Sequence, residues 1–473
     1  MSAHTALILL PVPAEIKLTD EKFPVKNLTG YSIAEEFHAV IPELERVFRT
    51  LRMEVAAESS GGACSLSKSD LPAGAWQMDI TADGITAAAG DITGAFYAVG
   101  ALTQMLFAAT ISGLPGDALD GAEIFDKPRF AVRSFHLDCA RHFQEKEFIK
   151  RFLHLLSACR INTFHWHLTD GQGWRYQSKA ADRMNGKGEL TDGQYTQEDI
   201  RQINALAKTL GITIIPEVDV PGHSRRLLAN YPELACDPDD PGNEICLGKP
   251  ESMQFLQAVF GELMELFPDS PVIHIGGDEA ATAHWEKCPH CRKAMEEKKC
   301  ANMRELENLF MVELSRFITA GGRTPIIWGT CSGQTYPDDT MIQVWLDIRE
   351  PLKIAPNGNK MIYSVHSSLY FDYPANLSEP WETWMFELSE KGVYMTDPYI
   401  IWQDKVKDHI IGTEACLWTE TIPQHRVFAK LFPRILAYSE CAWSLPEKKS
   451  FQNFSARREL LEAAGFTDYL KQN

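Results

Sequence analysis

Long hydrophobic runs are missing from this sequence of 473 residues. No apolar stretch approaches the roughly 20 residues that a membrane-spanning helix needs, so we expect no membrane span. A recognisable export signal is also lacking, because the segment from Met1 to Pro13 has neither a basic start nor a small-residue cleavage site. We therefore expect a cytoplasmic protein, although an exported chain with its signal trimmed away would look the same.

Positive charge is scarce as well. The chain has 46 Lys and Arg against 64 Asp and Glu, which gives a formal net charge of −18. This balance argues against nucleic acid or an anionic membrane as the main partner, since both favour a basic surface. Hydrophobic residues (45%) and charged residues (23%) are as frequent as in ordinary globular proteins, and the length exceeds what one compact domain usually needs.

The sequence does not indicate a disulfide framework either. Its 11 cysteines are odd in number and scattered, which favours reduced thiols in a cytosol-like compartment. Cys288-Pro-His-Cys291, with Cys300 beyond it, has the CxxC spacing of a zinc knuckle or a redox motif. We interpret this segment as an inserted loop with reduced thiols. The alternative is a small structural zinc site in which His284 or His290 is the fourth ligand.

Two patterns divide the chain. Up to residue 107, short strand-like runs alternate with turns, as at 75–80 and the following Asp83-Gly84, and a helix-periodic stretch at 96–106 closes the segment. Residues 111–127 are rich in Gly, Asp and Pro and lack periodicity, which indicates a linker. We therefore predict a small α+β domain at 1–125 and a second domain at 126–473.

The second domain alternates strand, loop and helix. Thr196-x-x-Asp199 predicts the capped start of one helix, and further helices are predicted at 145–160, 252–266, 303–320 and 426–443. The eight predicted strands are 131–138, 162–170, 212–219, 271–276, 325–328, 341–345, 361–365 and 414–418. Alternation implies parallel strands, and eight of them suit a closed barrel better than the alternative, an open doubly wound sheet. The predicted fold class is α/β, a (β/α)8 TIM barrel preceded by a small α+β domain.

Polar and aromatic side chains follow the predicted strands, at the end where such a barrel carries its active site. A single loop carboxylate is more often merely solvated, but here each of the eight strand ends carries at least one such group. The residues are Asp138, Arg141, Asp170, Asp219, His223, Asp278, Glu279, Trp328, Trp345, Tyr370, Asp372, Trp418 and Glu420. We therefore expect them to meet at one mouth of the barrel.

The run His274-Ile-Gly-Gly-Asp278-Glu279 is the sharpest feature of the sequence. Two adjacent carboxylates after an apolar strand repel each other and are costly to desolvate, and no basic residue lies nearby in sequence. The pair suits chemistry in which one carboxyl stays protonated and the other stays ionised. The Gly-Gly step lets backbone and substrate approach closely. We predict a catalytic pair, with a helix cap or a surface turn as the alternative.

Tryptophans gather near the predicted strand ends. They are Trp166, Trp174, Trp328, Trp345 and Trp418. Any one of them could be packing at the barrel rim. Several around one carboxylate pair indicate a sugar pocket, in which indoles stack on apolar ring faces and charged groups meet hydroxyls.

A second group of residues has the composition of a metal site. His165-Trp-His167 places two histidines on one face of a strand, and Asp170, His223 and His274 lie at related strand ends. Such a set could belong to a metal-dependent hydrolase. Histidines inside a strand are more often hydrogen-bonded core residues, and no HExxH-type spacing is present. The metal-dependent hydrolase is therefore the less favoured alternative.

Six segments carry a resemblance to a known family. In order they are Asp138-Cys-Ala-Arg141-His142-Phe143, His165-Trp-His-Leu-Thr-Asp170, Gln172-Gly-Trp174-Arg175, Pro216-Glu-Val-Asp219-Val-Pro-Gly-His223, His274-Ile-Gly-Gly-Asp278-Glu279 and Glu414-Ala-Cys-Leu-Trp418-Thr-Glu420. Together they resemble the family 20 glycoside hydrolases, the β-N-acetylhexosaminidases. The resemblance covers 133–443, and residues 6–107 are more weakly similar to the small α+β domain that precedes the barrel in that family.

The resemblance implies an exo-acting, retaining enzyme that removes terminal non-reducing β-linked N-acetylglucosamine or N-acetylgalactosamine. The 2-acetamido carbonyl of the substrate would attack the anomeric carbon and form an oxazolinium intermediate. Glu279 would be the general acid and then the base, and Asp278 would orient the acetamido N–H and stabilise the positive charge. No metal or cofactor is implied, and the partner is a glycan or glycoconjugate with a terminal N-acetylhexosamine.

The same resemblance implies roles on one side of the pocket. Arg141 matches the arginine that binds the outer hydroxyls of the terminal sugar, and Glu420 matches its acidic partner. Asp170 and His223 match polar residues that hold the pocket and the acid in place.

It also implies how the acetamido group is held. Tyr370 matches the tyrosine that hydrogen-bonds the acetamido oxygen, and Asp372 matches the neighbouring acid that reaches its nitrogen or a hydroxyl. Trp328, Trp345 and Trp418 match the walls around the acetamido group and the sugar ring.

Two positions depart from the family pattern. Many members read Thr-Asp-Asp where this chain has Thr169-Asp170-Gly171, which bears on contacts beyond the cleaved bond, and the usual Arg-Gly of the first strand is Arg133-Ser134 here. Two further hypotheses remain beside the metal-dependent hydrolase. One is a specialised member that releases a disaccharide or a sulfated N-acetylhexosamine. The other is a sugar-binding barrel without catalysis, against which the intact acid pair argues.

Overall fold

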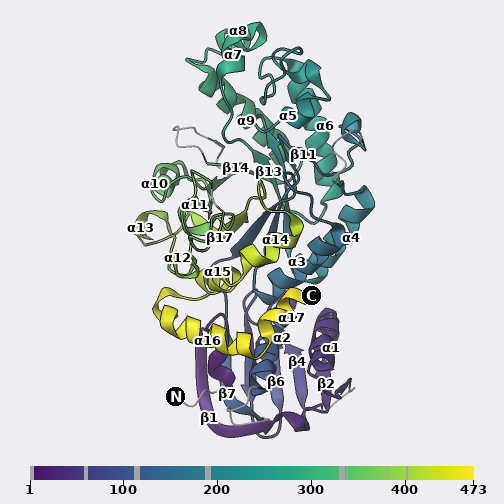
Figure 1. The fold of residues 1–473 in the computed structure, drawn as a ribbon, viewed down its shortest axis with the longest axis vertical. Helices are drawn as coiled ribbons and strands as arrows, with labels where there is room; N and C mark the ends of the chain where they lie inside the picture. The colour runs from purple at the N-terminus through teal and green to yellow at the C-terminus, as the bar shows by residue number, and fades with distance from the viewer. Residues whose placement is uncertain are drawn as a thin grey trace.

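The molecule consists of a sheet domain at one end and a barrel with its helices above it, joined by the C-terminal helices (Figure 1). The computed structural model describes residues 5–57, 62–110, 118–186, 193–329, 336–337, 339–380, 382–400 and 403–472.

The N-terminal domain is built on one mixed seven-stranded sheet in the order β1-β7-β5-β6-β4-β2-β3. Its strands are β1 Glu15–Pro24, β2 Gly30–Ile33, β3 Ala56–Ala57, β4 Cys64–Lys68, β5 Trp76–Ile80, β6 Ile85–Ala89 and β7 Ala118–Asp126. Helix α2 (Ile92–Ala109) packs on the sheet, and α1 (Ile41–Thr50) packs on α2.

Helix α2 is apolar on all sides because the protein encloses it. The side chain of Asp91 caps its start by accepting a 2.8 Å hydrogen bond from the backbone N–H of Gly94. Among the described residues it is the one helix long and apolar enough to cross a membrane by length and composition, and 83% of that stretch is buried inside the protein. A helix buried in a protein core has the same composition. This 18-residue stretch therefore forms part of the core of the N-terminal domain.

The prediction of a linker at 111–127 is wrong for its second half. Residues 118–126 form strand β7, which pairs antiparallel with both β1 and β5. Asp120 and Asp126, which suggested a loop, are buried and satisfied: Asp120 accepts a 2.7 Å hydrogen bond from the backbone N–H of Thr5, and Asp126 binds the guanidinium of Arg160. Distant partners thus allow two acids inside a central strand. Residues 111–117 lie outside the described part.

Eight parallel strands close into the predicted barrel in the order β12-β13-β14-β15-β16-β17-β8-β9. They are β8 Val132–Asp138, β9 Thr163–His167, β12 Thr213–Val220, β13 Val272–Gly276, β14 Thr324–Trp328, β15 Met341–Val344, β16 Met361–Tyr363 and β17 Ile410–Leu417. The short hairpin β10 Thr169–Asp170 and β11 Gly173–Trp174 follows β9. The predicted fold class is confirmed. Strand β17 begins earlier than predicted because Ile410 and Gly412 already pair with β16.

Helices surround the barrel, and the C-terminal helices lie between the barrel and the N-terminal domain (Figure 1). They are α3 Lys146–Ala158, α4 Gln197–Thr209, α5 Arg225–Leu228, α6 Pro250–Leu266, α7 Ala283–Lys287, α8 Pro289–Glu297, α9 Met303–Ala320, α10 Glu350–Ile354, α11 His366–Leu369, α12 Glu390–Tyr394, α13 Gln403–Val406, α14 Gln424–Leu431, α15 Arg434–Trp443, α16 Phe451–Ala463 and α17 Phe466–Gln472. The capping box of Thr196 and Asp199 is present as predicted. The single helix predicted at 426–443 is wrong, because Pro433 has no N–H and separates α14 from α15.

The C-terminal helices fasten the two domains together. Arg457 in α16 forms a 2.7 Å ion pair with Glu440 of α15 and donates to the backbone carbonyl of Leu9. Phe466 in α17 packs against Phe107 of α2 with ring centroids 5.7 Å apart. Arg457 and Phe466 therefore both connect the C-terminal helices to the N-terminal domain.

Candidate active site

A hollow of about 490 Å³ opens at the barrel mouth, where the strands end. Its lining consists of Arg141, Asp170, Asp219, His223, Asp278, Glu279, Trp345, Leu346, His366, Tyr370, Asp372, Tyr373, Trp384, Trp418 and Glu420. The structure therefore brings together every side chain that the sequence proposed for catalysis or substrate binding, with the exception of Trp328.

The loop after β13 carries the adjacent acids on a sharply turned backbone. Gly276 and Gly277 have φ angles of +71° and +103°, and Glu279 has φ +52°. A Cβ on Gly276 would stand 1.9 Å from Oδ1 of Asp219, so only glycine lets the two loops approach this closely. A left-handed backbone at a residue other than glycine costs about 1–3 kcal/mol and is most often found at functional sites.

Glu279 combines accessibility with a raised pKa. Its side chain is 60% exposed, and Oε2 lies 3.6 Å from Nε2 of His223. Partial burial and the negative charge of Asp278 raise the pKa of Glu279, while His223 opposes the shift. The carboxyl group is thus reachable and biased towards holding a proton, which are the two properties that a general acid needs.

Asp278 shares its surroundings with a second buried acid, Asp219. Ligand atoms of Asp219, His223 and Asp278 all lie within 4.8 Å of one another. Burial and the charge of Asp278 raise the pKa of Asp219 well above its ordinary value. Burial also raises the pKa of Asp278, but His223 opposes that shift. The two acids therefore titrate as a pair, in which the charge of Asp278 favours the protonated form of Asp219 and the charge of His223 favours the ionised form of Asp278.

His223 is the positive charge among these acids. Its Nδ1 lies 3.2 Å from Oδ1 of Asp170, and its Nε2 lies 3.8 Å from Oδ2 of Asp278. Burial alone would lower the pKa of His223, but Asp219, Asp170 and Asp278 raise it to about 10. The ring is therefore an imidazolium at neutral pH. It connects Asp170 to the two candidate catalytic acids, Asp278 and Glu279.

Arg141 also lines the hollow. Its Nη2 lies 2.8 Å from Oδ2 of Asp170 and 3.9 Å from Oε1 of Glu420, and its guanidinium lies 5.1 Å from the ring centroid of Trp418. Burial would lower the pKa of Arg141, but Asp138, Asp170 and Glu420 raise it above its usual value. A charged donor is thus fixed at the edge of the hollow, where it can bind sugar hydroxyls.

Aromatic rings form a wall of the hollow. The indole N–H of Trp345 donates a 2.7 Å hydrogen bond to the backbone carbonyl of Gly329, which fixes the plane of the ring. The rings of Tyr370 and Trp418 lie 6.0 Å apart. Fixed aromatic faces beside charged groups are the composition expected of a sugar-binding pocket.

Asp372 is a buried acid in the lining of the hollow, and one of its oxygens can bind a ligand. Burial and the charge of Glu420 raise the pKa of Asp372 to about 8. Its Oδ1 has no hydrogen-bond partner among the described residues. A buried polar atom that faces a hollow and lacks a protein partner is suited to bind a ligand.

Several residues of the hollow were missed as site residues. They are Asp219, Leu346, His366, Tyr373 and Trp384. Asp219 was visible as a strand-end acid but received no role. The others follow β15 or β16 at positions where the sequence has no motif, and only the fold brings them to the mouth. The His366 ring lies 2.8 Å from the hydroxyl of Tyr373, and Trp384 is 61% exposed at the rim.

Trp328 is not among the residues that line the hollow, and its role as a pocket wall stays a prediction. It is almost fully buried in the barrel interior, where its indole N–H donates a 2.7 Å hydrogen bond to Oε1 of Glu217. The Glu217 carboxylate also meets Nε2 of His165 at 3.2 Å, Nδ1 of His274 at 3.0 Å and the ring of His167. Trp328 therefore orders the layer that supports the pocket.

The buried histidines around Glu217 also bear on the hypothesis of a metal-dependent hydrolase. His165 has Glu217 on one ring nitrogen and Glu414 on the other, at 2.9 Å, and His167 has Glu217 on one and Asp170 on the other, at 3.1 Å. Burial would lower the pKa of His165, but Glu414 and Glu217 raise it to about 9. Both ring nitrogens of each of these two histidines thus already face carboxylates, which favours a hydrogen-bonded core.

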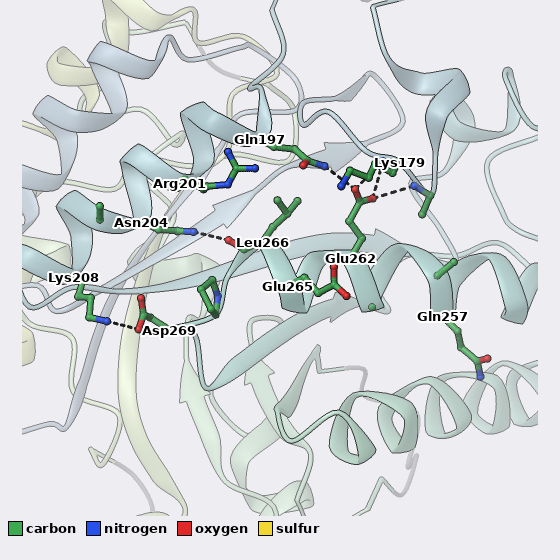
Figure 2. A pocket seen from close by; sticks show the side chains of 15 residues that line it. Lys179, Gln197, Arg201, Asn204, Lys208, Gln257, Glu262, Glu265, Leu266 and Asp269 are labelled. Atoms are coloured by element: carbon green, nitrogen blue, oxygen red, sulfur yellow. Dashed lines mark hydrogen bonds and ion pairs between the residues drawn. The ribbon is translucent and has the colours of Figure 1, made fainter.

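A larger hollow of about 720 Å³ lies on the outside of the barrel, between α4 and α6 (Figure 2). Lys208 forms a 2.7 Å ion pair with Asp269, and Glu262 accepts a 2.9 Å hydrogen bond from Gln197. These groups bind one another and hold the two helices together. The acid pair lies in the hollow at the barrel mouth, which is therefore the candidate active site.

The cysteine segment is assembled differently from the prediction. The structure places Cys288 and Cys291 together with Cys236 and Cys246, which the sequence analysis did not single out. Cys300, proposed as a ligand, is not a member of this group among the described residues, so that part of the prediction is corrected.

Two family models match the chain. The model for the catalytic domain of glycosyl hydrolase family 20 matches residues 130–446, and the model for domain 2 of the same family matches residues 6–127. The first covers the barrel and the second covers the N-terminal sheet domain.

Individual relatives agree with these matches. A β-hexosaminidase of Akkermansia muciniphila is 30% identical over 456 residues, which are 91% of this chain and 90% of the relative. A β-hexosaminidase of Porphyromonas gingivalis is also 30% identical, over 95% of this chain and 62% of its own length. The solved exo-β-N-acetylglucosaminidase of Vibrio harveyi with bound N-acetylglucosamine has a TM-score of 0.88 at 28% identity, covering 98% of this chain and 78% of that one. The β-N-acetylhexosaminidase of Bacteroides fragilis has a TM-score of 0.85 at 27% identity, covering 98% and 96%.

Proposed function

Because this chain belongs to glycosyl hydrolase family 20 and is a glycosidase, we propose that it removes single terminal, non-reducing β-linked N-acetylglucosamine or N-acetylgalactosamine residues. The resemblance drawn from six sequence segments is thereby confirmed at the level of the family. The observation that carries the finer proposal is the Asp278–Glu279 pair inside a hollow walled by Trp345 and Trp418.

Glu279 acts as the general acid and then as the general base. Its raised pKa favours the protonated form, and its exposed position lets it reach the oxygen of the leaving group. After the first step the carboxylate takes a proton from water, which opens the intermediate. Both steps keep the residue in the same place and only change its protonation state.

Asp278 acts on the substrate's own nucleophile. In a substrate-assisted reaction the 2-acetamido oxygen attacks the anomeric carbon, so no enzyme nucleophile, metal or cofactor is needed. The attack places positive charge on the acetamido group, and an ionised Asp278 stabilises it while accepting a hydrogen bond from its N–H. His223 lowers the pKa of Asp278 and so favours the ionised form that this role requires.

The exo preference is supported by a pair of charged residues in the lining of the hollow. Arg141 and Glu420 lie 3.9 Å apart there and together offer donors and an acceptor to the outer hydroxyls of one sugar. Asp372, with an oxygen that has no partner among the described side chains, adds a further acceptor or donor on the same ring.

A sulfated sugar fits this hollow less well than a neutral one. Its lining carries six carboxyl groups, against the cations Arg141 and His223; they are Asp170, Asp219, Asp278, Glu279, Asp372 and Glu420. Both cations are already paired with Asp170. An added sulfate would therefore find neither of these two cations unpaired, and a charge without a partner is costly in a partly buried site.

The first experiment compares an aryl β-N-acetylglucosaminide with the matching aryl β-glucoside, with and without a thiazoline mimic of the oxazolinium. We expect cleavage of the acetamido sugar only, and inhibition by the mimic, because the nucleophile belongs to the substrate. Equal cleavage of both sugars would require an enzyme nucleophile and would contradict the proposal. Loss of activity with a chelator would favour the metal-dependent alternative.

A further inference from the structure

Four cysteines from two separate loops meet at one point near the barrel mouth. Cys236 and Cys246 belong to the loop that follows β12, and Cys288 and Cys291 belong to the loop that follows β13. Their sulfur atoms all lie within 4.8 Å of one another. Cys246 and Cys291 are fully buried, Cys288 is nearly so, and Cys236 is partly buried.

The spacing of the sulfurs fits a tetrahedron around one ion. Cys246 lies 3.7 Å from Cys288 and 3.5 Å from Cys291, and Cys236 lies 3.8 Å from Cys291. These separations are far longer than a disulfide bond of about 2.05 Å. They agree with the edge of about 3.8 Å that a tetrahedral ion with Zn–S bonds of about 2.3 Å requires.

The surroundings of the cluster suit thiolates. Cys288 is the N-cap residue of the nine-residue helix α8, and Cys291 lies in its first turn. The positive end of a helix dipole favours the deprotonated sulfur. Lys249 donates hydrogen bonds of 2.6 Å to the carbonyl of Ala235 and 2.8 Å to that of Glu233, which places its positive charge beside the chain that leads into Cys236.

We infer that Cys236, Cys246, Cys288 and Cys291 bind one structural Zn²⁺ through four thiolates. Four sulfur ligands at tetrahedral spacing select zinc over the oxygen-preferring divalent ions. All four positions are filled by protein, so no coordination site is open for water or substrate, as in structural rather than catalytic zinc sites. None of the four cysteines lines the hollow that holds Asp278 and Glu279.

The position of the cluster explains what the ion does. The loop after β12 also carries His223, and the loop after β13 also carries Glu279. Two hydrogen bonds already join these loops: the backbone N–H of Ala281 donates to Glu244 at 3.2 Å, and the indole of Trp285 donates to the carbonyl of Ile245 at 2.9 Å. Zinc fastens the same two loops at their outer ends.

Close backbone packing supports this role. A Cβ on Gly248 would stand 2.2 Å from the backbone carbonyl carbon of His290 and 2.5 Å from the backbone nitrogen of Cys291. The loops are therefore pressed together directly beside the cysteines, and a ligand shared between them holds the contact. The ion acts on the geometry of His223 and Glu279 through the loops and takes no part in the reaction.

The test is the metal content of the full-length protein, purified without chelator and measured by plasma mass spectrometry. We expect about one zinc per chain, released when a mercurial reagent titrates the thiols. Cys291→Ser is expected to lose the metal. Cys300→Ser is the matched control, because Cys300 ends the same loop outside the cluster, and this variant is expected to keep its zinc. Loss of zinc is expected to lower the melting temperature of the wild type and to leave that of the metal-free Cys291→Ser protein unchanged.

Cobalt substitution keeps the test independent of how the variants fold. Co²⁺ in place of Zn²⁺ is expected to give the intense visible bands of a tetrahedral tetrathiolate site in the wild-type protein. A zinc-free wild type after growth with zinc, iron in place of zinc, a disulfide among the four cysteines, or a cobalt spectrum without tetrahedral bands would each overturn the inference. An active enzyme that contains no zinc overturns this inference alone, whereas a zinc-bound but inactive protein overturns the proposed function alone.

Discussion

Nε2 of His223 lies 3.6 Å from Oε2 of Glu279. The imidazolium therefore acts directly on the protonation of the candidate acid: its charge lowers the pKa of Glu279, while burial and Asp278 raise it. This one relationship makes the pH profile of the enzyme a test of the site.

The alkaline limb of kcat/KM reports the loss of the Glu279 proton. His223→Gln removes a positive charge, so we expect this limb to move to higher pH. Asp278→Asn removes a negative charge, so the limb of its residual activity should move to lower pH. The measurement is kcat/KM against pH for the wild type and both variants. Shifts in the same direction would contradict the electrostatic account.

Glu279→Gln removes the proton donor and keeps the shape of the side chain. We expect a loss of about 10²–10⁴ in kcat for substrates with poor leaving groups, since they depend on protonation. An activated aryl substrate should lose much less, and binding of the product sugar should persist. Kinetics with a series of leaving groups measures the difference. Glu286→Gln, an exposed glutamate of the same loop, is the control and should behave like the wild type.

Asp278→Asn should lower kcat by about 10²–10³, because the charge that stabilises the acetamido cation is lost. Asp219→Asn is the matched control. Burial and the charge of Asp278 raise the pKa of Asp219, which favours its neutral form, and an amide is also neutral, so we expect a loss below about tenfold. Single-turnover rates on the aryl N-acetylglucosaminide compare the two. A larger loss in Asp219→Asn than in Asp278→Asn would contradict the role given to Asp278.

The same control has a consequence for stability. The pKa of Asp219 is raised in the folded protein, whereas in the unfolded chain it ionises near 3.9. The unfolded state therefore binds fewer protons above about pH 4, and this group lowers stability as the pH rises. We expect Asp219→Asn to melt at a higher temperature than the wild type at neutral pH, with the gain disappearing at the acid end. Thermal scans across pH measure it.

Arg141→Lys keeps the charge and loses the planar fork that spans Asp170 and Glu420. We expect kcat/KM to fall by about 10–150-fold, which corresponds to about 1.5–3 kcal/mol for hydrogen bonds to a charged group. A substrate that lacks the outer hydroxyls should be cleaved poorly by the wild type and lose little more in the variant. Equal losses on both substrates would mean that the arginine has only a structural role.

Gly276→Ala tests the close approach of the two acid-bearing loops. The new Cβ would stand 1.9 Å from Asp219 and adopt a strained positive φ, so we expect destabilisation above about 3 kcal/mol. Gly322→Ala is the control, because Gly322 has a positive φ of +75° and no atom within 4 Å of the added Cβ. It should lose only about 1–2 kcal/mol. Chemical denaturation separates the two variants.

The periodic pattern of the sequence determined the barrel. Some of its parallel strands, such as 212–219, read as apolar runs because both faces are buried, and the predicted helices that alternate with the strands carry start and stop signals. The site acids could be predicted for the same reason, since strand ends of a barrel meet at one mouth. Asp278 and Glu279 could therefore be predicted as site residues from their position after an apolar strand alone.

Other features depended on partners that are remote along the chain. Strand β7 was mistaken for a linker because Asp120 and Asp126 are satisfied by Thr5 and Arg160, which lie 115 and 34 residues away. Trp328 was placed at a strand end, but only the closed barrel shows that its indole points down to Glu217.

Residue type and local spacing thus established the family, the barrel and the acid pair, because those signals repeat within a few residues. The tertiary structure decided which acids lie close enough to shift each other's pKa and which cysteines share a site. Cys246 is 42 residues from Cys288 and 45 from Cys291, yet their sulfurs lie within 3.7 Å. Burial and the distance between charges, which set every pKa in the pocket, exist only once the chain has closed on itself.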